Sequence, residues 1–130
     1  MTLDEFDRFC AALPHSTHVV QWGDASVWKI GGKVYAIGGW NESEELAVTF
    51  KCAPMSFAIL KDQPGLRPAP YLASRGLSWI QRFDSSSMDD AALMDYLAES
   101  RRLAASGLPK KLQIELRLIA PAKRAKKTRR

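Results

Sequence analysis

Residues 27–36 read VWKIGGKVYA, in which two mostly apolar runs flank a pair of glycines. A two-residue turn between antiparallel strands needs positive φ angles, and glycine adopts these angles without steric cost. The stretch therefore predicts a tight β-hairpin whose turn is formed by residues 31 and 32.

A regular hairpin fixes which side chains lie opposite one another. Side chains that lie directly opposite share a face of the sheet, so each pair occupies one face. The expected pairs are Ile30 with Lys33, Lys29 with Val34, Trp28 with Tyr35, and Val27 with Ala36. One face of the hairpin is then expected to carry Trp28, Ile30, Tyr35 and Ile37, with Lys29 on the other face.

Three further stretches have the pattern of strands. Residues 46–51 alternate apolar and polar side chains, so the apolar set is expected to face the core and the polar set to face away from it. Residues 19–22 and 78–83 also read as short strands. In the strand over 46–51 the apolar set is Leu46, Val48 and Phe50, and the polar set includes Thr49 and Lys51.

Helical periodicity marks the segments between the strands. Residues 3–13 begin with a capping box formed by Thr2 and Glu5, and the run ends at Pro14. Further helices are expected from Pro54 to before Pro64, over residues 88–105 with Ser87 as the cap, and as a short helix from Pro109 to about residue 118. This order of elements predicts a two-layer α+β fold with a mostly antiparallel sheet flanked by helices.

The positive charge of the chain is concentrated at its carboxyl end. Six of the 19 Lys and Arg residues lie within residues 121–130, which hold no Asp or Glu, and the whole chain has a formal net charge of +5. Residues 1–120 hold the other 13 basic residues and all 14 acidic ones, so their net charge is −1. The pattern predicts a domain over residues 1–120 and a basic tail over residues 121–130, which we expect to be disordered.

Four short stretches carry a resemblance to a known family. They are the hairpin at residues 27–36, KCAP at 51–54, GLRPAPYL at 65–72 followed by Trp79, and LPKK at 108–111. In this order they resemble the FKVGGKxFA hairpin, the strand-to-helix junction, the GIxPAPYL segment and the LPKK of the MmcQ/YjbR family. The resemblance extends over about residues 1–112.

This resemblance implies both a fold and a partner. The family's fold is an antiparallel sheet flanked by helices, sometimes described as a double-wing fold, and its members are commonly labelled DNA-binding. The chain departs from the family pattern in its basic extension beyond Leu112 and in Met55, which stands where the family often has Glu.

The residue types do not favour an enzyme. His15 and His18 follow the helix-ending Pro14, so their spacing does not bring them onto one helical face as a metal-binding or acid–base pair. The paired glycines are explained by the hairpin turn rather than by a phosphate-binding loop. Cys10 and Cys52 lack CxxC spacing and are expected to pack as small apolar residues. We therefore expect no catalytic site, no metal site and no cofactor.

Basic residues favour nucleic-acid binding. Lys and Arg contact phosphates without reading bases, so weak DNA binding without sequence preference is expected. One group of candidates belongs to the sheet face opposite the apolar set, where the pattern places Lys29, Lys51 and Arg82 beside Thr49. The other candidates, in the LPKK stretch and the tail, are Lys110, Lys111, Lys123, Arg124, Lys126, Lys127, Arg129 and Arg130.

A chaperone-like module that binds a protein or peptide, with no nucleic-acid role, is the alternative function. The stiff segment at residues 68–72 can line a peptide groove, and Trp40, beside a predicted turn, is either packed under a loop or exposed to a partner. A polar sheet face is also what any two-layer domain presents to solvent. DNA binding should weaken steeply with salt, whereas binding in a peptide groove should not.

The amino end and the apolar runs bear on the compartment. Asp4, Glu5 and Asp7 occur where a signal peptide has a positive segment followed by an apolar one. The apolar runs are far shorter than the roughly 20 residues that span a bilayer. We expect a cytoplasmic protein.

Overall fold

The structure is a computed structural model that describes residues 1–40, 45–70, 72 and 77–117. Within these ranges the strands form one antiparallel six-stranded sheet in the order β1-β2-β3-β4-β6-β5. The strands are β1 (Ser16–Gln21), β2 (Ala25–Ile30), β3 (Lys33–Gly38), β4 (Val48–Lys51), β5 (Leu66–Pro68) and β6 (Trp79–Arg82), and the helices are α1 (Leu3–Ala12), α2 (Pro54–Leu60), α3 (Asp90–Ser106) and α4 (Lys110–Glu115). The expected α+β fold is confirmed.

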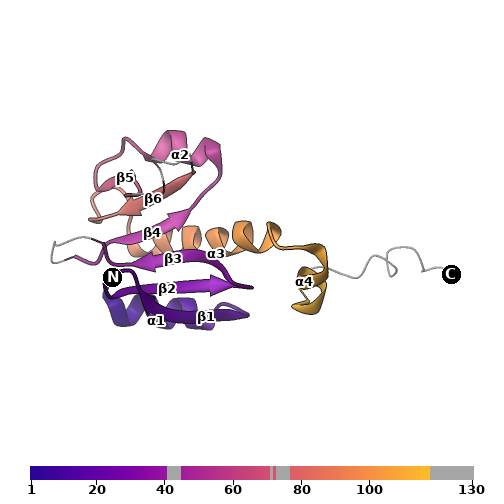
Figure 1. Cartoon of the computed structure of the whole chain (residues 1–130). Coiled ribbons are helices and arrows are strands. Elements are labelled where there is room, and N and C mark those ends of the chain that lie inside the picture. The colour runs from indigo at the N-terminus through magenta and orange to yellow at the C-terminus, as the bar shows by residue number, and fades with distance from the viewer. Residues whose placement is uncertain (41–44, 71, 73–76, 118–130) are drawn as a thin grey trace.

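Helices α1 and α3 pack on one face of the sheet, behind the strands in Figure 1. The main core lies between these layers and includes Phe6 from α1, Phe50 from β4, and Leu93 and Leu97 from α3, all fully buried. Helix α2 contacts β5 and β6 at one edge of the sheet. Leu112 of α4 lies against the hairpin turn, where a Cβ on Gly31 would come within 3.2 Å of its side chain.

Local sequence signals explain the ends of the helices. The capping box of α1 is confirmed, because Glu5 N–H donates to Thr2 Oγ1 and Thr2 N–H donates to Glu5 Oε1. The cap predicted for α3 is wrong, because Asp89, rather than Ser87, accepts a hydrogen bond from Ala92 N–H at 2.8 Å. A carboxylate at this position is also favoured by the positive end of the helix dipole.

The hairpin is confirmed, but its register changes within the strands. Residues 31 and 32 have φ angles of 55° and 85°, and Lys29 pairs with Val34 as expected. A β-bulge then makes Tyr35 an extra residue in β3, so Trp28 lies opposite Ala36. The predicted pair of Trp28 and Tyr35 is therefore wrong.

Hydrogen bonds of Tyr35 account for the bulge. The Tyr35 hydroxyl donates to Cys10 O at 3.3 Å and lies 2.7 Å from Ser16 Oγ. The Tyr35 carbonyl accepts from Ser100 Oγ of α3 at 2.6 Å, and Ser100 Oγ accepts in turn from Lys51 N–H at 2.8 Å. Ser100 therefore satisfies two backbone groups in the buried layer between α3 and the sheet.

Two side chains lie on the face opposite to the one predicted. Beyond the bulge, Ile37 lies opposite Val27 and packs with it on the side away from α1 and α3. In β6, Arg82 lies opposite Val48, which is part of the main core, so the Arg82 side chain belongs to the helix side. The prediction that Arg82 lies on an open basic face is therefore wrong.

Arg82 instead joins β6 to the start of α3. Its side chain is fully buried, and its guanidinium donates to Met88 O at 2.9 Å and to Asp90 Oδ1 at 3.0 Å. Glu45 supplies a second carboxylate, 3.6 Å from Arg82 Nη2. A buried guanidinium needs such partners, since burying an unpaired charge is costly.

Thr49 offers a test of the face opposite the helices. It was expected to face solvent, but it is fully buried, and its Oγ1 has no hydrogen-bond partner among the described residues. We expect Thr49→Val to raise the free energy of unfolding by about 1 kcal/mol. The substitution replaces an unsatisfied buried hydroxyl with a methyl group and changes the shape of the side chain little. Urea unfolding measures the change, and a lower midpoint for Thr49→Val would show that the hydroxyl is satisfied.

Candidate functional site

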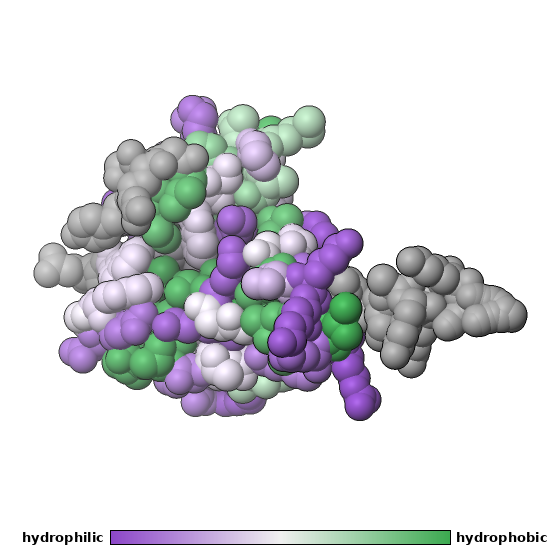
Figure 2. Space-filling view, turned by 45° about the vertical axis from the view of Figure 1, so that its right-hand side comes forward, coloured by the Kyte–Doolittle hydropathy of each residue, from purple (hydrophilic) through white to green (hydrophobic). Residues whose placement is uncertain are grey.

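The face of the sheet opposite α1 and α3 is apolar at its centre. Val27 and Ile37 are buried there, and Val34 packs against them. Figure 2 shows hydrophobic side chains between hydrophilic ones on the visible surface of the molecule. The centre of this face is therefore apolar, whereas the sequence pattern predicted a basic surface.

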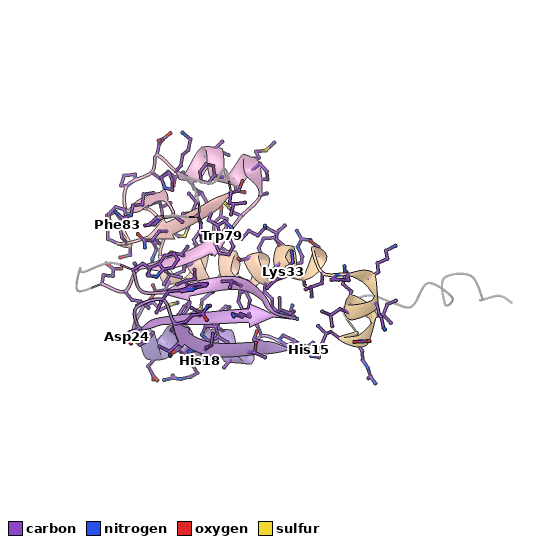
Figure 3. The ribbon with its side chains drawn as sticks, in the orientation of Figure 1. His15, His18, Asp24, Lys33, Trp79 and Phe83 are labelled. Atoms are coloured by element: carbon purple, nitrogen blue, oxygen red, sulfur yellow. The ribbon has the colours of Figure 1, made fainter. Side chains whose placement is uncertain are left out.

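A pocket of about 470 Å³ lies on this face. Ile37 and Trp79 are its most buried members, with exposed fractions of 1% and 7%, whereas Trp22 is 52% exposed. Trp79, labelled in Figure 3, comes from β6 and the two other tryptophans from the ends of β1 and β3. The lining residues are Trp22, Val34, Ile37, Trp40, Leu72 and Trp79.

Two of the tryptophans form an interacting pair at this pocket. The ring centroids of Trp22 and Trp40 are 5.9 Å apart with an interplanar angle of 41°, and Trp40 Nε1 donates to Trp22 O at 3.3 Å. Both residues have left-handed backbones, with φ of 55° and 72°. Such angles cost about 1–3 kcal/mol for a bulky residue and are concentrated at functional sites. The strain makes this pocket the leading candidate for a site.

Three basic side chains belong to the same face as the pocket. Lys29 lies opposite Val34, and Lys51 lies opposite Trp79, so each shares a face with a residue of the pocket lining. Arg67 lies opposite Gln81, and its Nε donates to Gln81 Oε1 at 2.7 Å. Among the described residues, none of these three side chains forms an ion pair.

The structure brings together only part of the predicted site. Lys29 and Lys51 are on the pocket face as expected, whereas Arg82 is buried on the opposite side. Lys110 and Lys111 are exposed in the first turn of α4, outside the sheet. The six basic candidates of the tail, Lys123, Arg124, Lys126, Lys127, Arg129 and Arg130, fall outside the described residues, as does the proposed boundary at residue 120.

Sequence reasoning missed Arg67 and the pocket. Arg67 could have been predicted from the alternation of the apolar Leu66, which is buried, with Arg67, which is exposed. This alternation is apparent only when β5 is recognised as a strand. The pocket has no comparable signal, because its residues come from segments as distant as Trp22 and Trp79.

Comparison with known proteins places the chain in a family. The model of the YjbR family matches residues 11–103. The chain belongs to the YjbR family. No curated protein matches it.

Solved structures share the fold of this YjbR-family chain. It resembles the crystal structure of the Deinococcus radiodurans protein DR2400, with a TM-score of 0.75 and 22% identity over 88% of this chain and 87% of that one. It also resembles a Pseudomonas syringae protein, with a TM-score of 0.64 and 18% identity over 80% of this chain and 99% of that one. At these identities the likeness extends to the fold alone.

Apart from the pocket, this YjbR-family chain has a polar cluster that joins α1 to β1 and β2. Asp7 Oδ1 accepts from Ser26 Oγ at 2.6 Å and from Trp28 Nε1 at 2.9 Å, and His18 Nε2 lies 2.7 Å from Ser26 Oγ. Because the Ser26 proton is directed to Asp7, His18 Nε2 must be the donor to Ser26. An activated serine instead needs the histidine as acceptor between it and the carboxylate. The cluster therefore connects elements and does not activate Ser26.

The cysteines of this YjbR-family chain lie in unreactive surroundings. Burial raises the pKa of the Cys10 thiol to about 12 and that of the Cys52 thiol to about 11. Both thiols are therefore protonated near neutral pH, and the thiolate is the reactive form. Within the described residues, no three His, Cys, Asp or Glu side chains gather as a metal ion would require, and no helix has the length and apolar character for crossing a bilayer.

Proposed function

We propose that this chain is a non-enzymatic, cytoplasmic protein that binds DNA weakly and without sequence preference. The observation that carries the proposal is the placement of Lys29, Lys51 and Arg67 on the same sheet face as a pocket lined by three tryptophans. Basic side chains contact phosphates, and aromatic rings stack on bases of any identity. The face supplies both kinds of contact.

The charge of the chain favours weak binding shared with the tail. Residues 1–120 have a net charge of −1, so their long-range attraction for phosphate is limited to local groups such as these three cations. The six basic residues of the tail add phosphate contacts that carry no sequence information. Nine contacts on a single strand correspond to a log–log salt slope of about −6, at 0.7 per contact.

We expect the salt slope to divide between tail and sheet face. Replacing the six tail cations with Gln in the full-length chain should reduce the slope for a single-stranded oligonucleotide to about −2, because three contacts remain. Adding Lys29→Gln, Lys51→Gln and Arg67→Gln should bring it close to zero. Fluorescence anisotropy at several salt concentrations measures both values.

Lys33→Gln is the matched control for these changes. Lys33, labelled in Figure 3, is an exposed strand lysine on the helix side, where a Cβ on Gly107 would lie 3.0 Å from its Nζ. Its replacement should leave the slope unchanged. Equal effects of Lys33→Gln and Lys51→Gln would contradict the assignment of the site to the pocket face.

A peptide-binding module is the second candidate, and one observation favours it. The lining residues that the structure describes all have largely apolar side chains, and they include Leu72, which belongs to the proline-rich segment expected to line a groove. Binding of an apolar side chain there depends on burial of its surface and varies little with salt. A salt slope near zero for the natural ligand would favour this function.

A further inference from the structure

We propose that the tryptophan-lined pocket receives one unstacked base of a single DNA strand, so that the protein binds single-stranded DNA in preference to duplex. This inference rests on the proposed function and specifies what its sheet face binds. It is carried by the shape of the pocket, the charges that share its face, and the backbone of its walls.

The pocket has the size and lining that a base requires. Its volume of about 470 Å³ lies within the range of roughly 300–1,000 Å³ found for sites that bind small organic molecules. Trp22 and Trp40 offer tilted rings at the wall, and Trp79 lies deeper. Stacking on such rings tolerates every base, because each base has a π-face.

The basic side chains favour a polyanion over an apolar peptide. Lys29, Lys51 and Arg67 belong to β2, β4 and β5, so successive cations are about two strand spacings, or roughly 10 Å, apart across the sheet. A flexible single strand that crosses the sheet in this direction passes the pocket between phosphate contacts. A neutral apolar ligand would bring no negative charge to Lys29 and Lys51, and would leave Arg67 with its contacts to Gln81 and the Phe83 ring.

Duplex DNA does not fit this arrangement. Its bases are stacked within the helix, and turning one outward costs a few kcal/mol of lost stacking and pairing. The pocket therefore stabilises a single strand and not a duplex, whose contacts are limited to phosphates.

The walls of the pocket are held in place before any ligand binds. The energetic cost of the left-handed backbones of Trp22 and Trp40 is offset by the contact between their rings and by the hydrogen bond from Trp40 Nε1 to Trp22 O. Because these rings are already ordered, binding a base loses little side-chain entropy. This accounts for strain in two bulky residues at one pocket.

The test uses the full-length chain with a labelled thymidine oligonucleotide and the same oligonucleotide in duplex form. Trp22→Ala should weaken single-strand binding about 5- to 150-fold, the range expected for loss of one stacked base. Duplex binding should change less than twofold. Trp22→Phe keeps a ring and should retain most of the affinity, and Ile59→Ala, which removes a 60% exposed apolar side chain on α2, should have no effect.

A second measurement needs no variant. The single strand should quench the tryptophan emission of the unaltered protein, whereas the duplex at equal saturation should not. The pocket assignment would be overturned if Trp22→Ala kept its affinity for the single strand while the variant lacking Lys29, Lys51 and Arg67 bound it more weakly. That result would leave the proposed function standing. No binding of either DNA at low salt would overturn both. Trp22-dependent binding of an acidic phenylalanine-containing peptide, without binding of the oligonucleotide, would assign the pocket to a protein partner.

Discussion

Replacing Arg82 with alanine is expected to lower the free energy of unfolding by about 3 kcal/mol. The change removes the donors to Met88 O and Asp90 Oδ1, leaves a cavity, and deprives Asp90 and Glu45 of their buried partner. The two carboxylates remain partly exposed to water, so the loss lies at the lower end of the range for a broken buried pair. Urea unfolding at neutral pH measures it.

The electrostatic part of this effect has a distinct pH dependence. Burial would raise the pKa of Asp90, but hydrogen bonds from Arg82 and from the Met1 ammonium outweigh it and hold the pKa below its usual range. A carboxyl group whose pKa is lower in the folded than in the unfolded state stabilises the fold. This stabilisation is complete above the pKa of the unfolded state, about 3.9 for Asp, and is lost as the pH falls through the pKa of the folded state. The difference between the natural chain and Arg82→Ala should therefore narrow below about pH 4.

Arg82→Met separates packing from charge. Methionine restores much of the stem volume without the guanidinium, so the pH-dependent part of the difference should remain and the cavity part should shrink. A destabilisation that is independent of pH in both variants would contradict the role assigned to the ion pairs.

Phe50→Ala is expected to destabilise the domain by about 3–5 kcal/mol, the largest effect that we predict. Phe50 is fully buried in the main core, and its ring lies 5.2 Å from that of Tyr96 at an interplanar angle of 27°. Its strand neighbour provides the control, since Lys51→Ala removes a half-buried side chain and leaves its backbone hydrogen bond to Ser100 intact. That change should stay within about 0.5 kcal/mol. Similar urea midpoints for the two variants would show that the faces of β4 are reversed.

Local patterns predicted the elements of the fold except β5, because each predicted element depends on neighbouring residues. The glycine pair required a tight turn, and the spacing of Thr2 and Glu5 required a capped helix. Alternation in β4 placed Phe50 in the core, which the structure confirms. The family resemblance, confirmed by the match over residues 11–103, implied the same α+β fold.

The faces of β3 and β6 depend on contacts that alternation does not contain. Tyr35 becomes an extra residue because its hydroxyl and carbonyl find partners on α1 and α3, which are distant in sequence. Arg82 is buried because Asp90 and Glu45 meet it there, so a charged side chain faces the helices. Of the basic residues predicted for the sheet face, the structure therefore confirms Lys29 and Lys51 and excludes Arg82. Arg67, which the structure places on that face, was not predicted.

The bulge at Tyr35 also sets the parity of the rest of β3. In a regular strand without a bulge, Val34 and Ile37 would point to opposite sides of the sheet. Because the bulge adds one residue between them, both side chains line the pocket. The same change directs residue 38 toward α1, where a Cβ would lie 2.8 Å from the Phe6 ring, so that only glycine fits. Deleting one residue between 34 and 37 would exchange inside for outside along the remainder of the strand, removing the floor of the pocket without altering any residue that lines it.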